Sequence, residues 1–251
     1  MGFNSKVAIV TGATGGIGQQ LVAQLISQGA KVVVTGRDAS SCALLEERYG
    51  DRLSALAGDI TATEHCQALV EHAVQRFGGL HLLFNNAGTI PRGTAIETSD
   101  EMWDSALAVN LTAAFKLSRA AIEHMRSNGG GTIVNTASAW GLYPGPAHLA
   151  YCTAKGALIA MTRSMGRDHA TQQIRINAVC PNEVDTPMLR SGFEYRGLDA
   201  KKALRELDNT VPLGHVAQPQ EIVDAMLFLA SEQSRYVTGT VLEVTGAKAV
   251  Y

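Results

Sequence analysis

Hydrophobic residues follow two patterns that alternate along the whole chain. Short unbroken apolar runs, typical of strands buried on both faces, alternate with longer stretches in which apolar positions recur every three or four residues, as on one face of a helix. The predicted strands cover residues 6–10, 31–34, 53–57, 80–84, 132–135, 174–179 and 241–244. The predicted helices cover residues 16–28, 63–77, 99–127, 151–169 and 221–230. One more helix is predicted to begin after an N-cap at Asp38 or Ser40 and to end at about residue 49.

This alternation predicts an α/β fold: one doubly wound Rossmann domain over residues 1–251, with a parallel sheet of about seven strands and helices on both faces. Residues 187–212 break the pattern, because they carry charges, two glycines and helical pieces such as 201–207. A long irregular segment inside a compact domain is usually functional. We therefore predict that residues 187–212 form a lid over the substrate and not a second domain.

Composition narrows the class of protein. Apolar residues make up 46% of the 251 residues, which excludes a disordered chain, and the net charge of −2 gives no basic footprint for nucleic acid or a membrane surface. No apolar run approaches the roughly 18 residues of a membrane span, and the first residues lack the features of a signal peptide, so we expect a cytoplasmic protein. The four cysteines and seven histidines lack metal-ligand spacing, so no metal site is expected.

A glycine-rich segment, Thr-Gly-Ala-Thr-Gly-Gly-Ile-Gly at residues 11–18, follows the first predicted strand and opens a helix. Glycines let the backbone turn sharply and approach a pyrophosphate, which the free N–H groups of the helix N-terminus attract. We assign Gly12, Gly16, Ile17 and Gly18 to a dinucleotide site. The segment lacks the Gly-Lys-Ser/Thr ending of an NTPase loop; the plainer alternative is a tight turn without a ligand.

Further motifs follow in a fixed order and spacing. They are Asp59-Ile60, Asn85-Asn86-Ala87-Gly88, Asn110, Ser138, Tyr151-x-x-x-Lys155 and the segment 181–186. With the glycine segment, they make the chain resemble the classical short-chain dehydrogenase/reductase family over nearly its whole length. The glycine spacing also fits the extended form of that family, but the short chain and the Asn-Asn-Ala-Gly turn favour the classical form. The resemblance implies a nicotinamide-dependent oxidoreductase.

The predicted catalytic residues are Asn110, Ser138, Tyr151 and Lys155. Tyr151 and Lys155 are four residues apart and share a helix face, where a lysine ammonium lowers the pKa of a phenol toward working pH. Ser138 is placed to donate a hydrogen bond to the same substrate oxygen. The resemblance adds that Tyr151 and Lys155 contact the cofactor, with Lys155 on the nicotinamide ribose, and that Asn110 supports a water-linked proton relay. Taken singly, the Tyr–Lys pair also fits packing plus a solvated cation, and Asn110 a helix cap or kink.

The resemblance also assigns cofactor contacts outside the glycine segment. Asp59 is expected at the adenine amine with the Ile60 backbone beside it, and Asn86 near the adenosine ribose. The Val184 backbone and the Thr186 hydroxyl are expected at the carboxamide. For Asp59 the alternative is that it caps the turn that follows it.

The choice between NADP and NAD depends on the end of the second strand. An NAD site usually places an acidic residue there to bind the ribose 2′-OH. In this chain Gly36 stands at that position, and Arg37 after it can hold a 2′-phosphate by charge-assisted hydrogen bonds. Asp38 keeps an NAD site open, although an aspartate here is also a good helix N-cap. The sequence favours NADP.

Five side chains are candidates for substrate contact. Arg92, after the Asn-Asn-Ala-Gly turn, can bind a carboxylate, and Trp140, Tyr143 and His148 lie between two catalytic residues. Glu183 stands after Pro-Asn where the family pattern has Pro-Gly, and it can hydrogen-bond a polyhydroxy or amino substrate. For Arg92 and Glu183 the alternative is a solvated charge, and for Trp140 it is packing of the pocket wall.

The sequence therefore predicts an NADP-preferring enzyme that interconverts a ketone and a secondary alcohol with Tyr151 as acid and base. Its substrate is a 3-oxoacyl thioester, a small carbonyl compound or a polyol. One alternative is an NAD-dependent secondary alcohol or polyol dehydrogenase, and another is a catalytically silent dinucleotide-binding regulator. The resemblance further implies a homotetramer.

Overall fold

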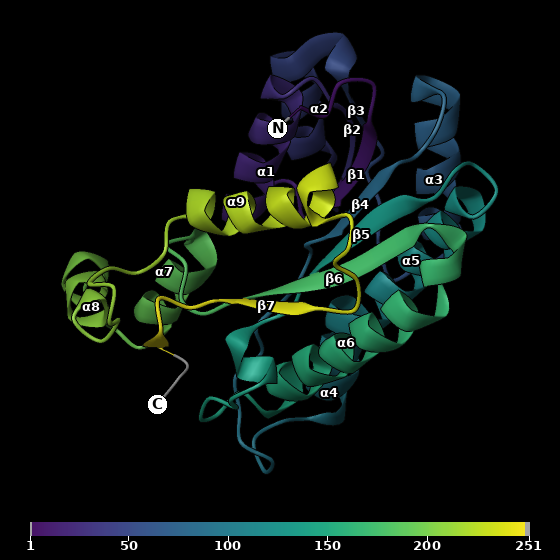
Figure 1. Cartoon of the computed structure of the whole chain (residues 1–251). Coiled ribbons are helices and arrows are strands. Elements are labelled where there is room, and N and C mark those ends of the chain that lie inside the picture. The colour runs from purple at the N-terminus through teal and green to yellow at the C-terminus, as the bar shows by residue number, and fades with distance from the viewer. Residues whose placement is uncertain (1, 249–251) are drawn as a thin grey trace.

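Seven parallel strands form one sheet in the order β3-β2-β1-β4-β5-β6-β7, as the computed structural model of residues 2–248 shows (Figure 1). The strands are β1 (Val7–Thr11), β2 (Lys31–Thr35), β3 (Leu53–Ala55), β4 (Leu82–Asn85), β5 (Gly131–Thr136), β6 (Ile174–Pro181) and β7 (Val241–Val244). The chain crosses over between β1 and β4, so the direction of winding reverses there. The prediction of a doubly wound sheet is confirmed.

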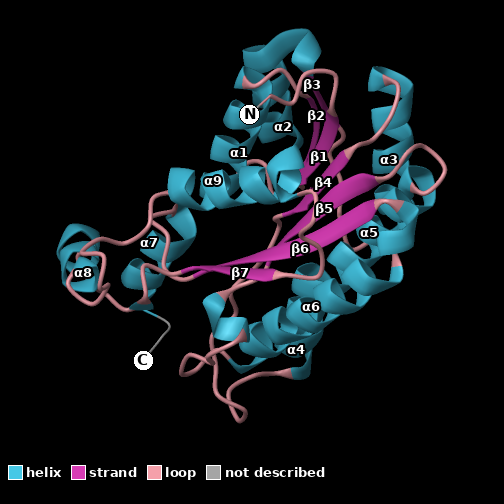
Figure 2. Ribbon diagram, viewed as in Figure 1, coloured by secondary structure: helices cyan, strands magenta, loops and turns pink. Residues whose placement is uncertain are grey.

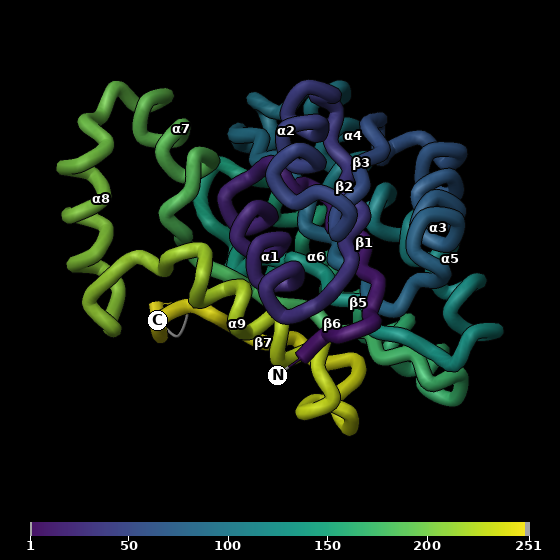
Figure 3. The backbone as a smooth tube through the Cα atoms, turned by 90° about the horizontal axis from the view of Figure 1, so that it is seen from above, coloured from purple at the N-terminus to yellow at the C-terminus, as the bar shows by residue number. Residues whose placement is uncertain are grey.

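Helices cover both faces of the sheet (Figure 2). They are α1 (Gly16–Ser27), α2 (Ala39–Tyr49), α3 (Thr63–Phe77), α4 (Asp100–Leu107), α5 (Ala113–Met125), α6 (Leu149–Asp168), α7 (Pro187–Tyr195), α8 (Ala200–Asp208) and α9 (Pro219–Ala230). Seen from above, α1 lies on one side of β1 and α3 and α5 lie on the other, while α7 and α8 form a separate lobe (Figure 3).

The apolar run of β1 explains why both faces are covered. Successive strand side chains point to opposite faces, so Ala8 and Val10 enter the core beneath α1 and α9, and Val7 and Ile9 enter the core beneath α3 and α5. All five residues of β1 are buried. A strand with this burial has no polar face, which is the pattern the sequence shows.

Several boundaries differ from the predicted ones. The single helix expected over 99–127 is divided into α4 and α5 by a π turn at Ala108–Thr112. The third strand stops at Ala55, two residues earlier than predicted, and the fourth is displaced toward Asn85. Residues 187–212 contain two helices, α7 and α8, which agrees with the helical pieces that the sequence indicated there.

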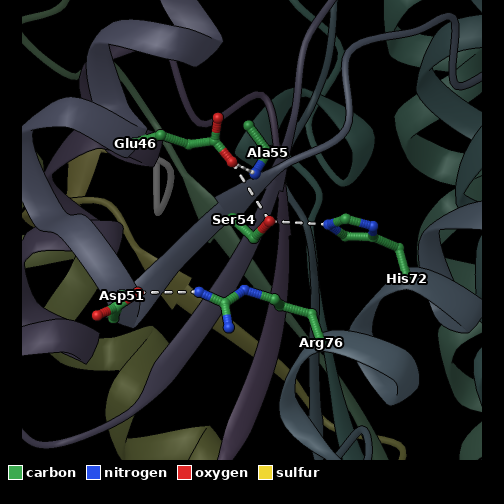
Figure 4. Close-up of polar contacts among 6 residues, drawn as sticks. All are labelled: Glu46, Asp51, Ser54, Ala55, His72 and Arg76. Atoms are coloured by element: carbon green, nitrogen blue, oxygen red, sulfur yellow. Dashed lines mark hydrogen bonds and ion pairs between the residues drawn. The ribbon is translucent and has the colours of Figure 1, made fainter.

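The exposed edge of the sheet at β3 is closed by side chains from α2 and α3 (Figure 4). Glu46 accepts a hydrogen bond from the Ala55 N–H at 2.7 Å, and the Ser54 hydroxyl lies 2.9 Å from Nε2 of His72. Arg76 and Asp51 form an ion pair at 3.1 Å beside them. An unpaired strand edge can pair with a strand of another chain. The Glu46 carboxylate accepts the hydrogen bond of the Ala55 N–H, which such pairing would need.

The four cysteines, Cys42, Cys66, Cys152 and Cys180, are free and buried. Within residues 2–248, no three histidine, cysteine, aspartate or glutamate side chains are grouped so as to hold a metal ion. No helix in the same range is both long and apolar enough to cross a membrane.

Candidate active site

The carboxyl ends of the central strands open into a cleft of about 1440 Å³. This is the place where open α/β sheets bind ligands, next to the point where the winding reverses. The cleft brings together nearly every residue that the sequence assigned to cofactor or substrate: Gly12, Gly16, Ile17, Gly18, Arg37, Asp59, Ile60, Asn86, Arg92, Ser138, Trp140, His148, Tyr151, Lys155, Glu183, Val184 and Thr186. Asn110 and Tyr143 are not part of its lining.

The glycine segment has the shape that close approach of a dinucleotide requires. Gly12 has φ +64°, and a Cβ there would lie 2.8 Å from the Ala87 backbone. A Cβ at Gly18 would lie 2.1 Å from the Gly12 carbonyl oxygen, so only glycine lets α1 pack this close to the turn. The N-cap of α1 is Gly15, which offers no side-chain cap to the first N–H groups of the helix. Those N–H groups remain available to a pyrophosphate, and the segment fits a dinucleotide.

Asn86 and Thr11 hold that turn in place. The Thr11 hydroxyl accepts hydrogen bonds from the backbone N–H groups of Asn86 and Ala87, both at 3.0 Å. The Asn86 amide in turn donates to the carbonyl oxygens of Thr11 at 3.2 Å and Gly12 at 3.3 Å. Asn86 therefore positions the glycine turn, a role the sequence did not indicate, and Thr11 is a supporting residue that sequence reasoning missed.

Arg37 and Asp38, the two candidates for binding the adenosine ribose, have different surroundings in the structure. Asp38 is the N-cap of α2: its carboxylate accepts from the Ser40 N–H at 3.0 Å and from the Ser41 hydroxyl at 2.5 Å, and it is not part of the cleft lining. Arg37 is exposed and lines the cleft. Asp59 lines the cleft too, while its carboxylate accepts from the Thr61 N–H at 2.9 Å, which lowers its pKa. Asp59 thus caps its turn and faces the cleft at once.

Ser138, Tyr151 and Lys155 converge on one wall of the cleft. Desolvation of the Tyr151 phenol raises its pKa to about 12, and its hydrogen bond with Ser138 acts in the opposite direction but is weaker. The Lys155 side chain is 4% exposed, its ammonium donates to the Thr136 carbonyl oxygen at 2.7 Å, and burial lowers its pKa to about 8. The ammonium lies 5.8 Å from the centre of the Tyr151 ring.

The expectation that Lys155 lowers the pKa of Tyr151 is therefore wrong for this structure. The spacing does place both side chains on one face of α6, but Lys155 is turned to Thr136. Removal of the phenol from water disfavours its charged form more than its neighbours favour it.

Asn110 lies buried behind the wall and not in it. Its side-chain amide donates to the carbonyl oxygens of Thr89 and Ala106, both at 3.0 Å, and its oxygen accepts from the Thr89 N–H at 3.1 Å. It sits in the π turn, so the alternative of a helix kink describes its local role. A Cβ at Gly88 would lie 2.8 Å from the Asn110 oxygen and 3.5 Å from the Lys155 nitrogen, which places both groups around one glycine.

The substrate candidates divide in the same way. The Trp140 ring meets Tyr151 edge-on at 6.3 Å and lies 4.5 Å from the His148 ring. The prediction that Tyr143 contacts the substrate is wrong. Tyr143 is exposed outside the cleft, and its hydroxyl lies 3.4 Å from Oε1 of Glu243. Glu183 lines the cleft, and the alternative that its carboxylate is simply solvated does not describe it.

The Glu183 carboxylate pairs with the ammonium of Lys248 at 2.7 Å. Its other oxygen is buried and accepts no hydrogen bond from residues 2–248. Sequence reasoning also missed Tyr195 and Arg196, which line the cleft from the end of α7. The one feature of the sequence that could have pointed to these two residues is that they lie in the irregular segment 187–212.

Comparison with known proteins shows what the chain is similar to. A family model described as enoyl-(acyl carrier protein) reductase matches residues 12–246. The chain is 33% identical over 251 residues to a 3-oxoacyl-acyl-carrier-protein reductase of Vibrio cholerae, covering 98% of each chain. It is 34% identical over 253 residues to a D-beta-hydroxybutyrate dehydrogenase of Cupriavidus necator, covering 97% of this chain and 98% of that protein. A variant of the actinorhodin polyketide ketoreductase, solved with NADPH, superimposes with a TM-score of 0.93 at 30% identity, covering 98% of both chains.

Proposed function

Because the chain belongs to the classical short-chain dehydrogenase/reductase family, whose members are oxidoreductases acting on CH–OH and C=O groups, we propose that it interconverts a ketone and a secondary alcohol with NADP as the preferred cofactor. The observation that carries the proposal is the convergence of Ser138, Tyr151 and Lys155 on one wall of a cleft whose other end is the glycine turn. The relatives named above are enzymes, and nothing in the comparisons favours a silent regulator.

In the proposed reaction, side chains of this protein transfer the proton and stabilise the charge that develops on the substrate oxygen. When bound, the nicotinamide supplies or accepts the hydride, a step that no side chain can perform. With a pKa of about 12, the Tyr151 phenol is protonated near pH 7 and is ready to donate its proton to a substrate carbonyl oxygen. The Ser138 hydroxyl is placed to hydrogen-bond the same oxygen as charge develops on it. These protonation states suit reduction of a ketone at neutral pH.

The preference for NADP is supported by the separate positions of Arg37 and Asp38. A guanidinium free at the cleft wall is suited to a 2′-phosphate, whereas the Asp38 carboxylate is already engaged with the N-terminus of α2. An NAD-dependent alcohol or polyol dehydrogenase would need Asp38 to leave that cap.

Replacement of Arg37 by alanine is expected to weaken use of NADP by about 1–3 kcal/mol, the range of one charge-assisted contact, because its partner phosphate loses the guanidinium. Use of NAD should change much less, since NAD lacks that phosphate. The measurement is kcat/KM for both cofactors, with Asp38→Asn as the matched control. Equal loss for both cofactors in Arg37→Ala, or a parent enzyme that prefers NAD, would refute the NADP assignment.

The lid remains part of the proposal. α7 and α8 stand apart from the layered body and contribute Met188, Phe193 and Leu207 to the cleft lining (Figure 3). We expect backbone amides in 187–212 to exchange with deuterium faster in the free protein than with NADP and product bound, because closure buries them. Mass-spectrometric hydrogen exchange on both states measures this. Strong and equal protection in the two states would show a fixed wall in place of a lid.

We also propose a homotetramer in the cytoplasm. The tetramer is supported by family membership, and the reducing compartment is supported by four free, buried cysteines. Light scattering coupled to size-exclusion chromatography tests the assembly.

A further inference from the structure

Two arginines stand at the substrate end of the cleft without an acidic partner. Arg92 follows the turn after β4, Arg196 follows α7, and both line the cleft together with His148. Within residues 2–248, neither guanidinium forms an ion pair with a carboxylate. Positive charge that is placed in a concave site and left uncompensated there attracts an anion.

The backbone fixes the position of Arg92. The N–H of Gly93 donates to the Ala147 carbonyl oxygen at 2.7 Å, and the N–H of Leu149 donates to the Gly93 carbonyl oxygen at 3.2 Å. These two bonds form a short bridge between Gly93 and His148, which keeps Arg92 beside the start of α6.

Both guanidinium groups then meet at Gly192 of α7. A Cβ at Gly192 would lie 2.6 Å from Nη2 of Arg92, and Nε of Arg196 donates to the Gly192 carbonyl oxygen at 3.1 Å. Arg92 also stacks on the Tyr195 ring, 5.5 Å from its centre. The absence of a side chain at Gly192 makes room for the Arg92 guanidinium, while Arg196 binds the carbonyl oxygen of the same residue.

This spot is close to the reacting end of the cleft. The His148 ring contacts Trp140, and Trp140 contacts Tyr151 edge-on, so one aromatic ring separates His148 from the catalytic phenol. Burial, together with the charges of Arg92 and Arg196, lowers the pKa of His148, so both guanidinium groups lie within electrostatic range of this ring.

The acidic side chains at this end of the cleft are already engaged. Glu97 accepts from the backbone N–H and the hydroxyl of Thr94, both at 2.8 Å. Glu183 is paired with Lys248. The positive charge of the two arginines is therefore left for a ligand.

We propose that Arg92 and Arg196 bind a carboxylate of the substrate, so that the enzyme acts on oxo acids and hydroxy acids in preference to neutral ketones and polyols. The inference rests on the proposed oxidoreductase function and names its substrate class. Arginine is suited to this role because its planar fork binds a carboxylate through two parallel hydrogen bonds.

Turnover of matched acids and esters tests the proposal. The probes are acetoacetate, levulinate and benzoylformate, each against its methyl ester, with NADPH. The wild type is expected to favour the acid at least tenfold in kcat/KM in one or more pairs. Arg92→Gln should abolish that preference by lowering kcat/KM for the acid at least tenfold more than for the ester. Arg92→Lys should restore part of the preference, and exposed Arg235→Gln, with the same change of net charge, should have no effect. A wild type that favours the ester in every pair, or an Arg92→Gln protein that loses acid and ester rates equally, overturns the proposal.

A binding measurement separates this site from the catalytic proposal. The chain has two tryptophans, so in a Trp103→Phe background the fluorescence reports on Trp140 alone. Levulinate should change that fluorescence and methyl levulinate should not, and Arg92→Gln should remove the response. Anion binding without turnover of any probe would uphold the site and refute the oxidoreductase assignment. Ester turnover without a fluorescence response to levulinate would uphold the oxidoreductase assignment and refute the anion site.

Discussion

Replacement of Tyr151 by phenylalanine is expected to lower turnover by about a hundredfold or more, the scale of positioned acid–base catalysis. Phenylalanine keeps the ring that packs edge-on against Trp140 and removes only the oxygen that we propose to move the proton. Cofactor affinity should change little, because the glycine turn and the ribose-binding side chains are untouched.

The measurements for Tyr151→Phe are steady-state turnover and NADPH titration. Tyr143→Phe is the matched control, since its hydroxyl contacts Glu243 outside the cleft and its removal should leave turnover unchanged. A Tyr151→Phe enzyme with near-normal turnover would exclude Tyr151 as the acid and base. In the wild type, the phenol stays protonated to about pH 12 in the absence of ligands, so alcohol oxidation should rise with pH well beyond neutrality while ketone reduction does not.

Replacement of Lys155 by methionine is expected to stabilise the fold at pH 7 while it damages activity. Burial lowers the pKa of Lys155 from 10.5 to about 8, so at pH 7 the folded protein holds a charge that its surroundings disfavour. The shift corresponds to roughly 3 kcal/mol, reduced by the lost hydrogen bond to Thr136. We expect a net gain of about 1–3 kcal/mol in the free energy of unfolding for Lys155→Met at pH 7.

The same shift sets a pH dependence with a definite sign. Between pH 8 and 10.5 the unfolded chain binds the Lys155 proton more tightly than the folded chain does, so stability rises with pH across that window. Above pH 10 the raised pKa of Tyr151 acts oppositely, because the folded state then keeps a proton that the unfolded state loses. Urea unfolding at pH 7 and pH 9.5 measures the effect of Lys155→Met and the rise in stability between the two pH values, with exposed Lys201→Met as the control. A Lys155→Met protein less stable than wild type at pH 7 would contradict the argument.

The fold and most of the cleft could be predicted from the sequence because both follow from local patterns. Unbroken apolar strands require helices on both faces, and the carboxyl ends of parallel strands necessarily meet at one edge. The glycine turn, Arg37 and Ser138 each follow such a strand end, so their gathering was implied once the strands were identified.

What could not be predicted depends on contacts between distant segments. The π turn at Asn110 is anchored to Thr89, and Glu183 is paired with Lys248 near the end of the chain. Neither partner is visible in the periodicity. The direction of Tyr143 depends on Glu243 of the last strand. The pKa of Tyr151 depends on how completely the phenol is desolvated, which the spacing to Lys155 does not report.

The central place of β1 in the sheet has a consequence for how the protein is made. β1 is synthesised well before β4, yet Ala8 pairs with Leu82 of β4, roughly 75 residues later. At about 5–20 residues per second, one edge of this buried strand waits roughly 4–15 s for its partner. Parallel pairing across such a separation is slow even after synthesis. During this interval the unpaired edge of β1 is open to pairing with other chains, which favours aggregation during synthesis.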